Sequence, residues 1–365
     1  MSFTAYLPQK IFTGTEWLTD YAIIIENGLI KELIPETQVP GNITAKKYEG
    51  FFAPAFFDLQ IYGANRKLLA VYPESRTLLQ MQSYCYKGGA AQFLPTVATN
   101  TKEVVYKCID AVKQYWKQGE TGVYGLHLEG PWLNKDRRGA HIKELIHSPI
   151  KNDVAELLEY GKGVIKMITL APEVCSDEII QLILSHNIII SAGHSNADYG
   201  LAINNFDKGI TVVTHLYNAM SPLQHRSPGL VGAAFMHDKV MSSIIADGYH
   251  VDYAAIKIAK SIMKERLFVI TDAVTQTDKG HYQHHLNGDK YECNGVLSGS
   301  ALTMHSSFTN LVNMVGIEIG EALRMCSLYP AQVLKADHLY GKIAPGYAAQ
   351  FIIMNKQLEL VHMVI

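Results

Sequence analysis

The sequence predicts an α/β protein, a TIM-like (β/α)8 barrel with a small β-sandwich domain assembled from both chain termini. Three observations predict this fold class. Eight short apolar runs alternate with longer segments of helical period through the middle of the chain. Most of these runs are continuously apolar, as expected for parallel strands covered on both faces. Short β-rich runs with turn signals lie outside this repeat, at the two ends of the chain.

The first fifty residues and the last twenty-five predict the small domain. Strands are expected in IFTG, YAIIIENGLI and KELIPE, which Asn-Gly and Pro signals separate. The closing stretch has similar short strands and a turn at Pro345-Gly346. We therefore assign residues 1–52 and 341–365 to a small β domain and residues 53–340 to the barrel.

The middle of the chain supplies the barrel strands. The eight runs are residues 51–60, 89–96, 122–129, 164–172, 187–194, 210–216, 241–248 and 267–273. Segments of helical period fill the gaps, for example residues 101–119 and 176–186. A doubly wound open sheet is the alternative, but no G-x-G-x-x-G follows the first run and no P-loop is found.

Composition excludes several classes of protein. Of the 365 residues, 48% are apolar and 18% are charged, which argues against a disordered chain. The formal charge of −2 gives no general reason to bind nucleic acid or an anionic membrane. The five cysteines are widely spaced and form no C-x-x-C, so a disulfide framework is not expected. The start does not resemble a signal peptide and no apolar run suits a membrane span, so we expect a cytoplasmic protein.

Four chemically active side chains end four of the apolar runs. Glu129 ends the third run, His194 the fifth, His215 the sixth, and Asp272 lies at the end of the eighth. In a barrel, the carboxyl ends of all strands meet at one face, where active sites are built. Two His and one Glu are a ligand set of catalytic zinc, with a fourth position open to water. A carboxylate beside such an ion can act as the general base, and Asp272 suits that role.

Each of these residues also has a structural alternative. A single His at a strand end is more often a hydrogen-bonded core residue than a ligand. Glu129 could cap the following helix, and Asp272 could be a plain N-cap. All 15 histidines lie at or after His127, so the first third of the chain supplies no imidazole ligand.

A second group of polar residues follows strand ends and could bind an anionic substrate. These are His141, Asn218, Ala219, Arg226 and His250. Arg, His and backbone N–H groups are what a phosphate needs, although each residue alone could be loop structure. The His-rich stretch at residues 281–288 is interpreted as a surface hairpin outside the catalytic site.

Seven motifs, which follow one another along the chain, resemble those of a known protein family. They are LHLEGPWLN (126–134), GAH (139–141), AGHS (192–195), THLYNAM…HRSPGLVGAAF (214–235), ADGYHVD (246–252), ITDAV (270–274) and LSGSALTM (297–304). They cover most of the barrel, and LHLEGPW and THLYNAM are long and specific. The chain resembles N-acetylglucosamine-6-phosphate deacetylases of the amidohydrolase superfamily. The resemblance implies the same barrel and the same small domain.

The resemblance also implies roles for the residues. Glu129, His194 and His215 would be the metal ligands, Asp272 the catalytic acid and base, and His141 would help to polarise the acetyl carbonyl. The second group would contact the sugar phosphate, within one chain or across a subunit interface: Asn218, Ala219, Arg226 and His250.

The resemblance further implies the cofactor, the reaction and the assembly. One divalent metal per subunit is expected, Zn²⁺ first and Fe²⁺ or another ion as the alternative. The reaction would release acetate from N-acetylglucosamine 6-phosphate in amino-sugar catabolism, by a homodimer or homotetramer. The alternatives are another N-acetyl amino sugar phosphate, a cyclic amide, or a non-catalytic sugar-phosphate sensor on the same scaffold.

The chain departs from the wider superfamily at the first barrel strand. Many relatives carry H-x-H there and bind a second metal, whereas this chain has Gln60 and Tyr62. Gln60 resembles members that bind one metal, and it could hold a water beside the ion. Tyr62 fits neither pattern, and the segment ANRKLLAVYP replaces the usual Gly-rich loop. We therefore expect one metal, with the altered loop bearing on the choice of substrate.

Overall fold

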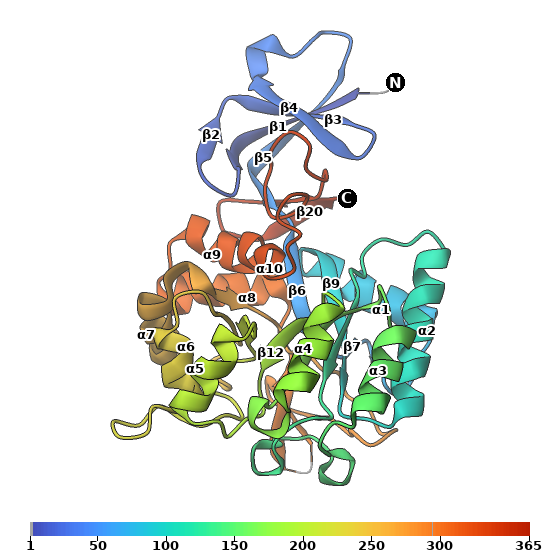
Figure 1. Ribbon diagram of the computed structural model, residues 1–365. Helices are drawn as coiled ribbons and strands as arrows, with labels where there is room; N and C mark the ends of the chain where they lie inside the picture. Colours follow the sequence, from blue (N-terminus) through green and yellow to red (C-terminus); the bar gives the residue numbers. More distant parts are fainter. Residues whose placement is uncertain (1–2, 294) are drawn as a thin grey trace.

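The structure is a computed structural model that describes residues 3–293 and 295–365 (Figure 1). Residues 1 and 2 of the predicted small domain lie outside the described residues. The predicted fold class is confirmed, because eight parallel strands form a nearly closed barrel and a second sheet joins the two chain ends. In Figure 1 this second sheet lies at one end of the molecule, and the green loops around residues 130–150 lie at the other.

All eight predicted apolar runs supply a barrel strand. The strands are β6 (Phe56–Ile61), β9 (Ala90–Ala98), β10 (Leu126–Glu129), β11 (Ile165–Leu170), β12 (Ile189–Ala192), β13 (Val212–Val213), β14 (Met241–Ile244) and β15 (Leu267–Val269). They pair in parallel in chain order from β6 to β15. Just past β15, the Asp272 N–H donates to the Gln60 carbonyl at 2.9 Å, and Ala273 bridges Ile61 in parallel. These contacts close the ring between its first and last strands.

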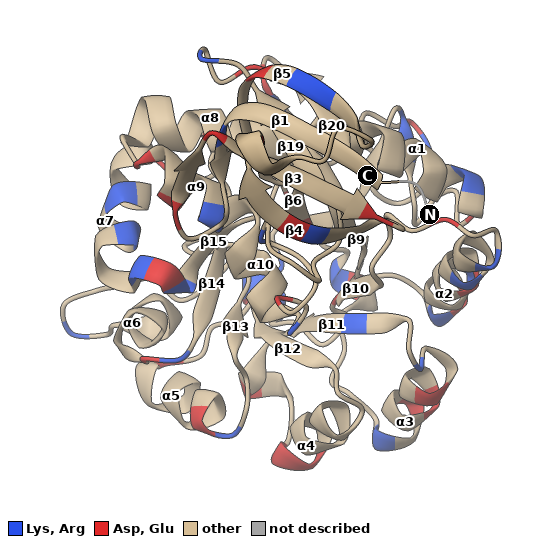
Figure 2. Ribbon diagram, turned by 90° about the horizontal axis from the view of Figure 1, so that it is seen from above, with Lys and Arg blue, Asp and Glu red and all other residues tan. Residues whose placement is uncertain are grey.

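Helices cover the outside of the barrel, as Figure 2 shows from the side of the small sheet. They are α1 (Ser75–Lys87), α2 (Lys102–Lys117), α3 (Lys151–Tyr160), α4 (Asp177–Ser185), α5 (Tyr199–Asp207), α6 (Gly229–Met236) and α7 (Tyr253–Met263), followed by α8 (Met304–Asn310), α9 (Ile319–Cys326) and α10 (Leu328–Val333). Side chains cap the two helices expected from periodicity, because Thr101 accepts from the N–H of Val104 and Ser176 from that of Ile179. Helices α2, α3 and α7 carry charged residues on the outside of the barrel.

The second sheet contains seven strands from both ends of the chain. They are β1 (Phe3–Phe12), β2 (Trp17–Thr19), β3 (Tyr21–Glu26), β4 (Leu29–Pro35), β5 (Thr44–Pro54), β19 (Phe351–Met354) and β20 (Leu360–Val364). β19 pairs antiparallel with β5, and the rings of Phe52 and Phe351 stack with centroids 5.1 Å apart. Packing between the two ends of the chain therefore holds this unit together. The domain boundaries at residues 52/53 and 340/341 stay a prediction.

One further sheet follows the last barrel strand. Strands β16 (His285–Asn287), β17 (Lys290–Cys293) and β18 (Val296–Ser300) pair antiparallel in chain order. The short strands β7 (Gly63–Ala64) and β8 (Lys67–Leu68) form a separate hairpin after the first barrel strand. Within the described residues, every helix is too short or too polar to cross a membrane.

Candidate active site

Four residues from four separate strand ends meet in one cavity. Glu129 is the last residue of β10, while His194, His215 and Asp272 follow β12, β13 and β15. All four line one cavity, which encloses about 890 Å³ when its open mouth is included. Each is at most 7% exposed. The convergence predicted from the strand pattern is therefore present in the fold.

Three of these residues have an uncommon backbone conformation. The φ angles of His194, His215 and Asp272 are +48°, +34° and +54°. Residues with a Cβ rarely adopt this left-handed region, at a cost of about 1–3 kcal/mol each, and such residues cluster at functional sites. Hydrogen bonds donated by the backbone N–H hold two of them, since His215 donates to Ser243 Oγ at 2.8 Å and Asp272 donates to the Gln60 carbonyl at 2.9 Å. The surrounding barrel stabilises three turns that the isolated segments would not favour.

The side chains of Glu129, His194 and His215 present potential ligand atoms to one point. Glu129 Oε1 lies 3.3 Å from His194 Nε2 and 3.2 Å from His215 Nε2, and the two nitrogens are 3.1 Å apart. Bonds of about 2.0–2.1 Å in a tetrahedral zinc site put neighbouring ligand atoms about 3.3–3.4 Å apart. The three separations are close to the edges of such a tetrahedron, so the donor set fits one divalent cation.

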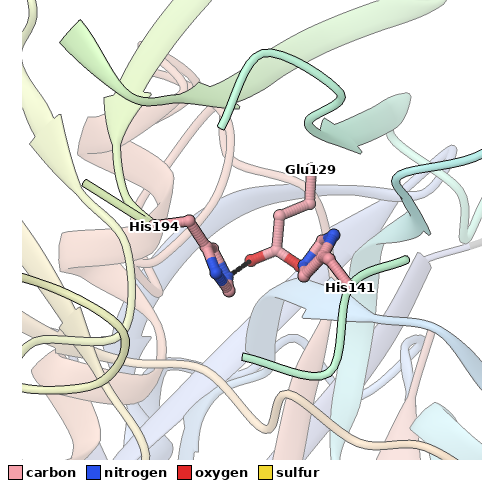
Figure 3. Close-up of side chains that lie close together, drawn as sticks. All are labelled: Glu129, His141 and His194. Atoms are coloured by element: carbon pink, nitrogen blue, oxygen red, sulfur yellow. Dashed lines mark hydrogen bonds and ion pairs between the residues drawn. The ribbon is translucent and has the colours of Figure 1, made fainter. Parts of the chain in front are cut away.

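His141 approaches the same carboxylate from the other side. Ligand atoms of Glu129, His141 and His194 lie within 4.8 Å of one another. Figure 3 shows the carboxyl group of Glu129 between the two imidazole rings. The Nε2 of His141 is 3.0 Å from Glu129 Oε2, the oxygen that faces away from the other two histidines. Four residues thus offer more than one way to choose three ligands, and hydrogen bonding must separate them.

The partners of each Nδ1 indicate which imidazole can offer a lone pair. His194 Nδ1 lies 2.9 Å from the Arg137 carbonyl, which can only accept, so we assign the proton to Nδ1 and the lone pair to Nε2. His141 differs, because the N–H of Thr99 donates to its Nδ1 at 3.3 Å and Thr99 Oγ1 lies 2.8 Å away. Its proton is then on Nε2, which makes His141 a donor to Glu129. His215 Nδ1 has no partner among the described residues.

Gly130, next to Glu129, allows Thr99 to reach this position. Gly130 has φ +86°, and a Cβ there would lie 2.2 Å from Thr99 Oγ1. Any larger residue would displace the threonine that sets the protonation of His141. Glycine at position 130 therefore allows Thr99 to hydrogen-bond His141 Nδ1.

Asp272 lies beside the proposed ligand atoms with one amide partner. Gln60 Nε2 donates to Asp272 Oδ1 at 2.7 Å and also to Glu129 Oε1 at 3.0 Å. Burial raises the pKa of Asp272 far above that of an ordinary carboxyl, although the nearby His215 opposes the shift. A carboxylate made more basic in this way is suited to accept and return a proton near neutral pH.

Three of the predicted substrate residues line the same cavity. They are Asn218, Ala219 and His250. His250 Nδ1 is 2.5 Å from Asp247 Oδ2, and the His250 backbone N–H donates to Asp247 Oδ1 at 2.8 Å. Because Asp247 engages Nδ1, Nε2 is the nitrogen of His250 that a ligand can reach.

Arg226 does not join them. It is exposed at the tip of a tight turn closed by hydrogen bonds between Gln224 and Ser227, in a loop before α6. Among the described residues, no Lys or Arg lines the cavity. The prediction that Arg226 contacts substrate is therefore not met within one chain.

The expectation that the His-rich hairpin lies outside the site is wrong. Tyr282 and His284 are buried and line the cavity, whereas His281 and His285 are exposed. His284 Nδ1 is 2.9 Å from Ser298 Oγ, and burial lowers the pKa of His284 to about 4, so it is neutral. The period of two in HYQHH could have revealed this, because alternate residues of an extended segment face the same side.

Tyr62 is the other cavity residue whose role the sequence left open. Its hydroxyl donates to Glu129 Oε2 and accepts from Gln60 Nε2 at 2.7 Å. With Val274 and with Leu68 of the altered first loop, it forms part of the apolar wall of the cavity. The side chain therefore belongs to the centre of the site.

Comparison with protein families matches nearly the whole chain. Residues 53–364 match the amidohydrolase family, and residues 7–51 match the NagA composite domain. A similar curated protein is the N-acetylglucosamine-6-phosphate deacetylase of Haemophilus influenzae, 32% identical over 97% of this chain and 96% of that protein. The N-acetylgalactosamine-6-phosphate deacetylase of Escherichia coli O157:H7 is 28% identical over 96% and 95%.

A solved structure agrees with the computed fold throughout. The crystal structure of N-acetylglucosamine-6-phosphate deacetylase from Pasteurella multocida has a TM-score of 0.94 and 31% sequence identity. The match covers 100% of this chain and 98% of that one. Both the barrel and the terminal sheet are therefore shared.

Proposed function

The chain belongs to the amidohydrolase family, and from this premise we propose that it hydrolyses N-acetylglucosamine 6-phosphate to glucosamine 6-phosphate and acetate. The observation that carries the proposal is the meeting of Glu129, His194, His215 and Asp272 in one cavity. Three of them match the ligand set of a catalytic zinc site, and the fourth is a carboxyl of raised pKa. A non-catalytic sensor would not need that carboxyl.

We assign the metal ligands as Glu129 Oε1, His194 Nε2 and His215 Nε2. Their mutual separations of 3.1–3.3 Å favour this set. His141 is left out because Thr99 occupies its Nδ1, so that Nε2 carries a proton. Zn²⁺ fits this nitrogen-rich tetrahedral set best, with Fe²⁺ as the alternative. When bound, a divalent ion supplies Lewis-acid chemistry that makes a water molecule acidic near neutral pH.

The protein's own groups then move protons and stabilise charge. Asp272 takes a proton from the water molecule as the water oxygen attacks the acetamide carbon. The Nε2–H of His141, which donates to Glu129 Oε2 in this structure, would turn to the carbonyl oxygen as negative charge develops there. The C–N bond breaks as Asp272 returns the proton to the departing nitrogen. The oxygen from water leaves in acetate, and the amino sugar phosphate keeps its nitrogen.

We propose that the sugar phosphate lies toward His250, Asn218 and the backbone N–H of Ala219. All three residues line the cavity, and the N–H groups of Asn218 and Ala219 can donate to phosphate oxygens. His250 Nδ1–H already donates to Asp247, so its Nε2 donates to phosphate in the imidazolium form. A dianion also favours a permanent cation, which the described cavity lining does not contain. Arg226, exposed on its loop, would reach the cavity of a neighbouring subunit in a homodimer or a homotetramer of such dimers.

Complementation between subunits tests this arrangement. Arg226→Ala and Asp272→Asn chains are each expected to be nearly inactive, and mixing them after dissociation should restore part of the activity. A heterodimer then has one site with both intact residues. No recovery in mixed dimers, shown to have formed by differential tags, would place Arg226 outside the neighbouring site.

A second candidate substrate is N-acetylgalactosamine 6-phosphate. Two curated relatives that act on it by name are 28% and 30% identical to this chain, close to the 32% of the glucosamine-type relative. The epimers differ in the direction of one hydroxyl. The residue types in the cavity do not separate them.

The test is acetate release by protein of measured metal content. The substrates are N-acetylglucosamine 6-phosphate, its galactosamine epimer and unphosphorylated N-acetylglucosamine, each with and without added Zn²⁺. We expect metal-dependent release with the highest kcat/KM on the first substrate. Faster release from the epimer would reassign the substrate, and no release from any of them with one ion bound would contradict the proposal.

A further inference from the structure

The two oxygens of the Glu129 carboxylate face different kinds of groups. Oε1 lies 3.3 Å and 3.2 Å from the Nε2 atoms of His194 and His215, where the cation is proposed. Oε2 faces away from that point and is bonded by the hydroxyl of Tyr62 and by His141 Nε2 at 3.0 Å. Oε1 thus lies at the proposed cation position, where Gln60 Nε2 also donates to it at 3.0 Å, whereas Oε2 is held by Tyr62 and His141.

The groups around Oε2 present hydrogens rather than lone pairs. Tyr62 and Glu129 are hydrogen-bonded, and an ionised carboxylate only accepts, so the phenol proton points at Oε2. The amide of Gln60 is oriented by its acceptors, since its Nε2 contacts Tyr62 Oη at 2.7 Å, Asp272 Oδ1 at 2.7 Å and Glu129 Oε1 at 3.0 Å. The assigned proton on His141 Nε2 completes the set. Two donors, the Tyr62 hydroxyl and His141 Nε2–H, therefore face Oε2, while the Gln60 amide holds the Tyr62 hydroxyl and contacts Oε1.

A second cation next to Oε2 would need the opposite arrangement. In two-metal sites the ions lie about 3.5–4 Å apart and share ligands that have free lone pairs on both sides. Here the groups that contact Oε2 are an O–H and an N–H, whose hydrogens carry positive partial charge. Tyr62 is central, because its ring lines the cavity and its hydroxyl joins Glu129 to Gln60.

We propose that Tyr62 is a positioning residue that holds this centre at one cation per chain. Its hydroxyl orients Glu129 so that Oε1 alone faces the ion, and it closes the position beside Oε2 to a second ion. The inference rests on the proposed metal centre, but not on the identity of the substrate. It gives a physical role to the residue at which the chain departs from related sequences.

Metal binding by three variants tests the proposal without any substrate. Tyr62→Phe keeps the ring and removes the donor, while Tyr62→His removes the donor and adds a potential ligand beside Oε2. Tyr84→Phe is the matched control, because the Tyr84 hydroxyl donates to the Leu302 carbonyl at 2.9 Å, outside the cavity. Zinc per chain would be measured by elemental analysis, and the Kd by competition with a chromogenic chelator.

We expect one ion per chain in the wild type and in the control, with equal Kd values. Tyr62→Phe should still bind one ion, about 10- to 100-fold more weakly, as when the hydrogen-bond partner of a ligand is lost. Its kcat at limiting zinc should fall and should recover in excess zinc, which a purely structural role would not produce. Tyr62→His should bind more than one ion per chain.

Each alternative result overturns the proposal. Two ions in the wild type would refute the exclusion of a second cation, and one ion in a folded Tyr62→His chain would show that Tyr62 does not close that position. A Tyr62→Phe chain with an unchanged Kd would refute the orientation of Glu129. Failure of the proposed deacetylation alone would leave these metal measurements unaffected, so the two proposals can fail separately.

Discussion

Replacing Asp272 by Asn separates proton transfer from metal binding. Asn has nearly the same shape, and it is among the residues that best tolerate the left-handed backbone that position 272 adopts at φ +54°. Its side-chain oxygen can still accept from Gln60 Nε2, which lies 2.7 Å from Asp272 Oδ1. The amide lacks the basicity that burial confers on the carboxyl. The substitution therefore removes the proton acceptor and leaves the surroundings in place.

The expected loss follows from the two steps that need this group. General acid–base catalysis contributes about 10²- to 10⁴-fold to a rate. Asp272 both accepts the proton of water and returns it to nitrogen, so we expect kcat to fall about 10³- to 10⁴-fold. At about 1.4 kcal/mol per factor of ten, this is about 4–5.5 kcal/mol of transition-state stabilisation. The metal content should stay at the wild-type value, because Asp272 is not among the three proposed ligands.

Acetate release and elemental analysis on the same preparation check this prediction. Asp58→Asn is a suitable control, since Asp58 is another buried carboxyl, bonded to Thr271 Oγ1 at 2.5 Å, and does not line the cavity. The control should keep kcat within about tenfold of the wild type. An Asp272→Asn enzyme with more than a tenth of wild-type kcat would refute the assignment of Asp272. Loss of the metal together with activity would instead make it a ligand.

Three further predictions concern neighbouring groups. His141→Gln should lower kcat about 10²- to 10³-fold at unchanged metal content, as expected for one oxyanion donor, and loss of the metal would make His141 a ligand. His284→Ala should raise KM about tenfold with little change in kcat, because the side chain lines the cavity but is not one of the groups proposed to react. An unchanged KM for both sugar phosphates would exclude contact between His284 and the substrate. Dialysis against a chelator should abolish activity and lower the melting temperature, since an ion at 1,000 times its Kd stabilises the folded chain by about 4 kcal/mol. Re-addition of Zn²⁺ should reverse both effects. An enzyme that keeps its activity and melting temperature after dialysis would contradict the proposed metal centre.

The part of the site that lies at strand ends could be predicted from sequence. Glu129, His194, His215 and Asp272 each follow a continuous apolar run, and parallel strands in a barrel leave only one face for such residues. This inference requires only the order of strands and helices along the chain and does not require the positions of side chains. The structure confirms that they meet, while their catalytic roles stay proposals for experiment.

Residues placed by loops could not be predicted in the same way. Arg226 looked like a substrate contact on its motif, but the turn between Gln224 and Ser227 holds it away from the cavity of its own chain. His284 looked like a surface residue, but the sheet of β16, β17 and β18 folds it against Ser298 at the cavity wall. A loop's direction depends on contacts far along the chain, and no local pattern encodes it.

The sequence by itself determined the barrel, the joining of the two chain ends, and the residue types available for metal and proton chemistry. Apolar periodicity carries this information because burial of strands and helices is decided over a few neighbouring residues. Only the tertiary structure decided which nitrogen of His141 carries a proton and which oxygen of Glu129 faces the other histidines. Those choices depend on Thr99 and Tyr62, residues 42 and 67 positions away from their partners, and hydrogen bonds act only at contact.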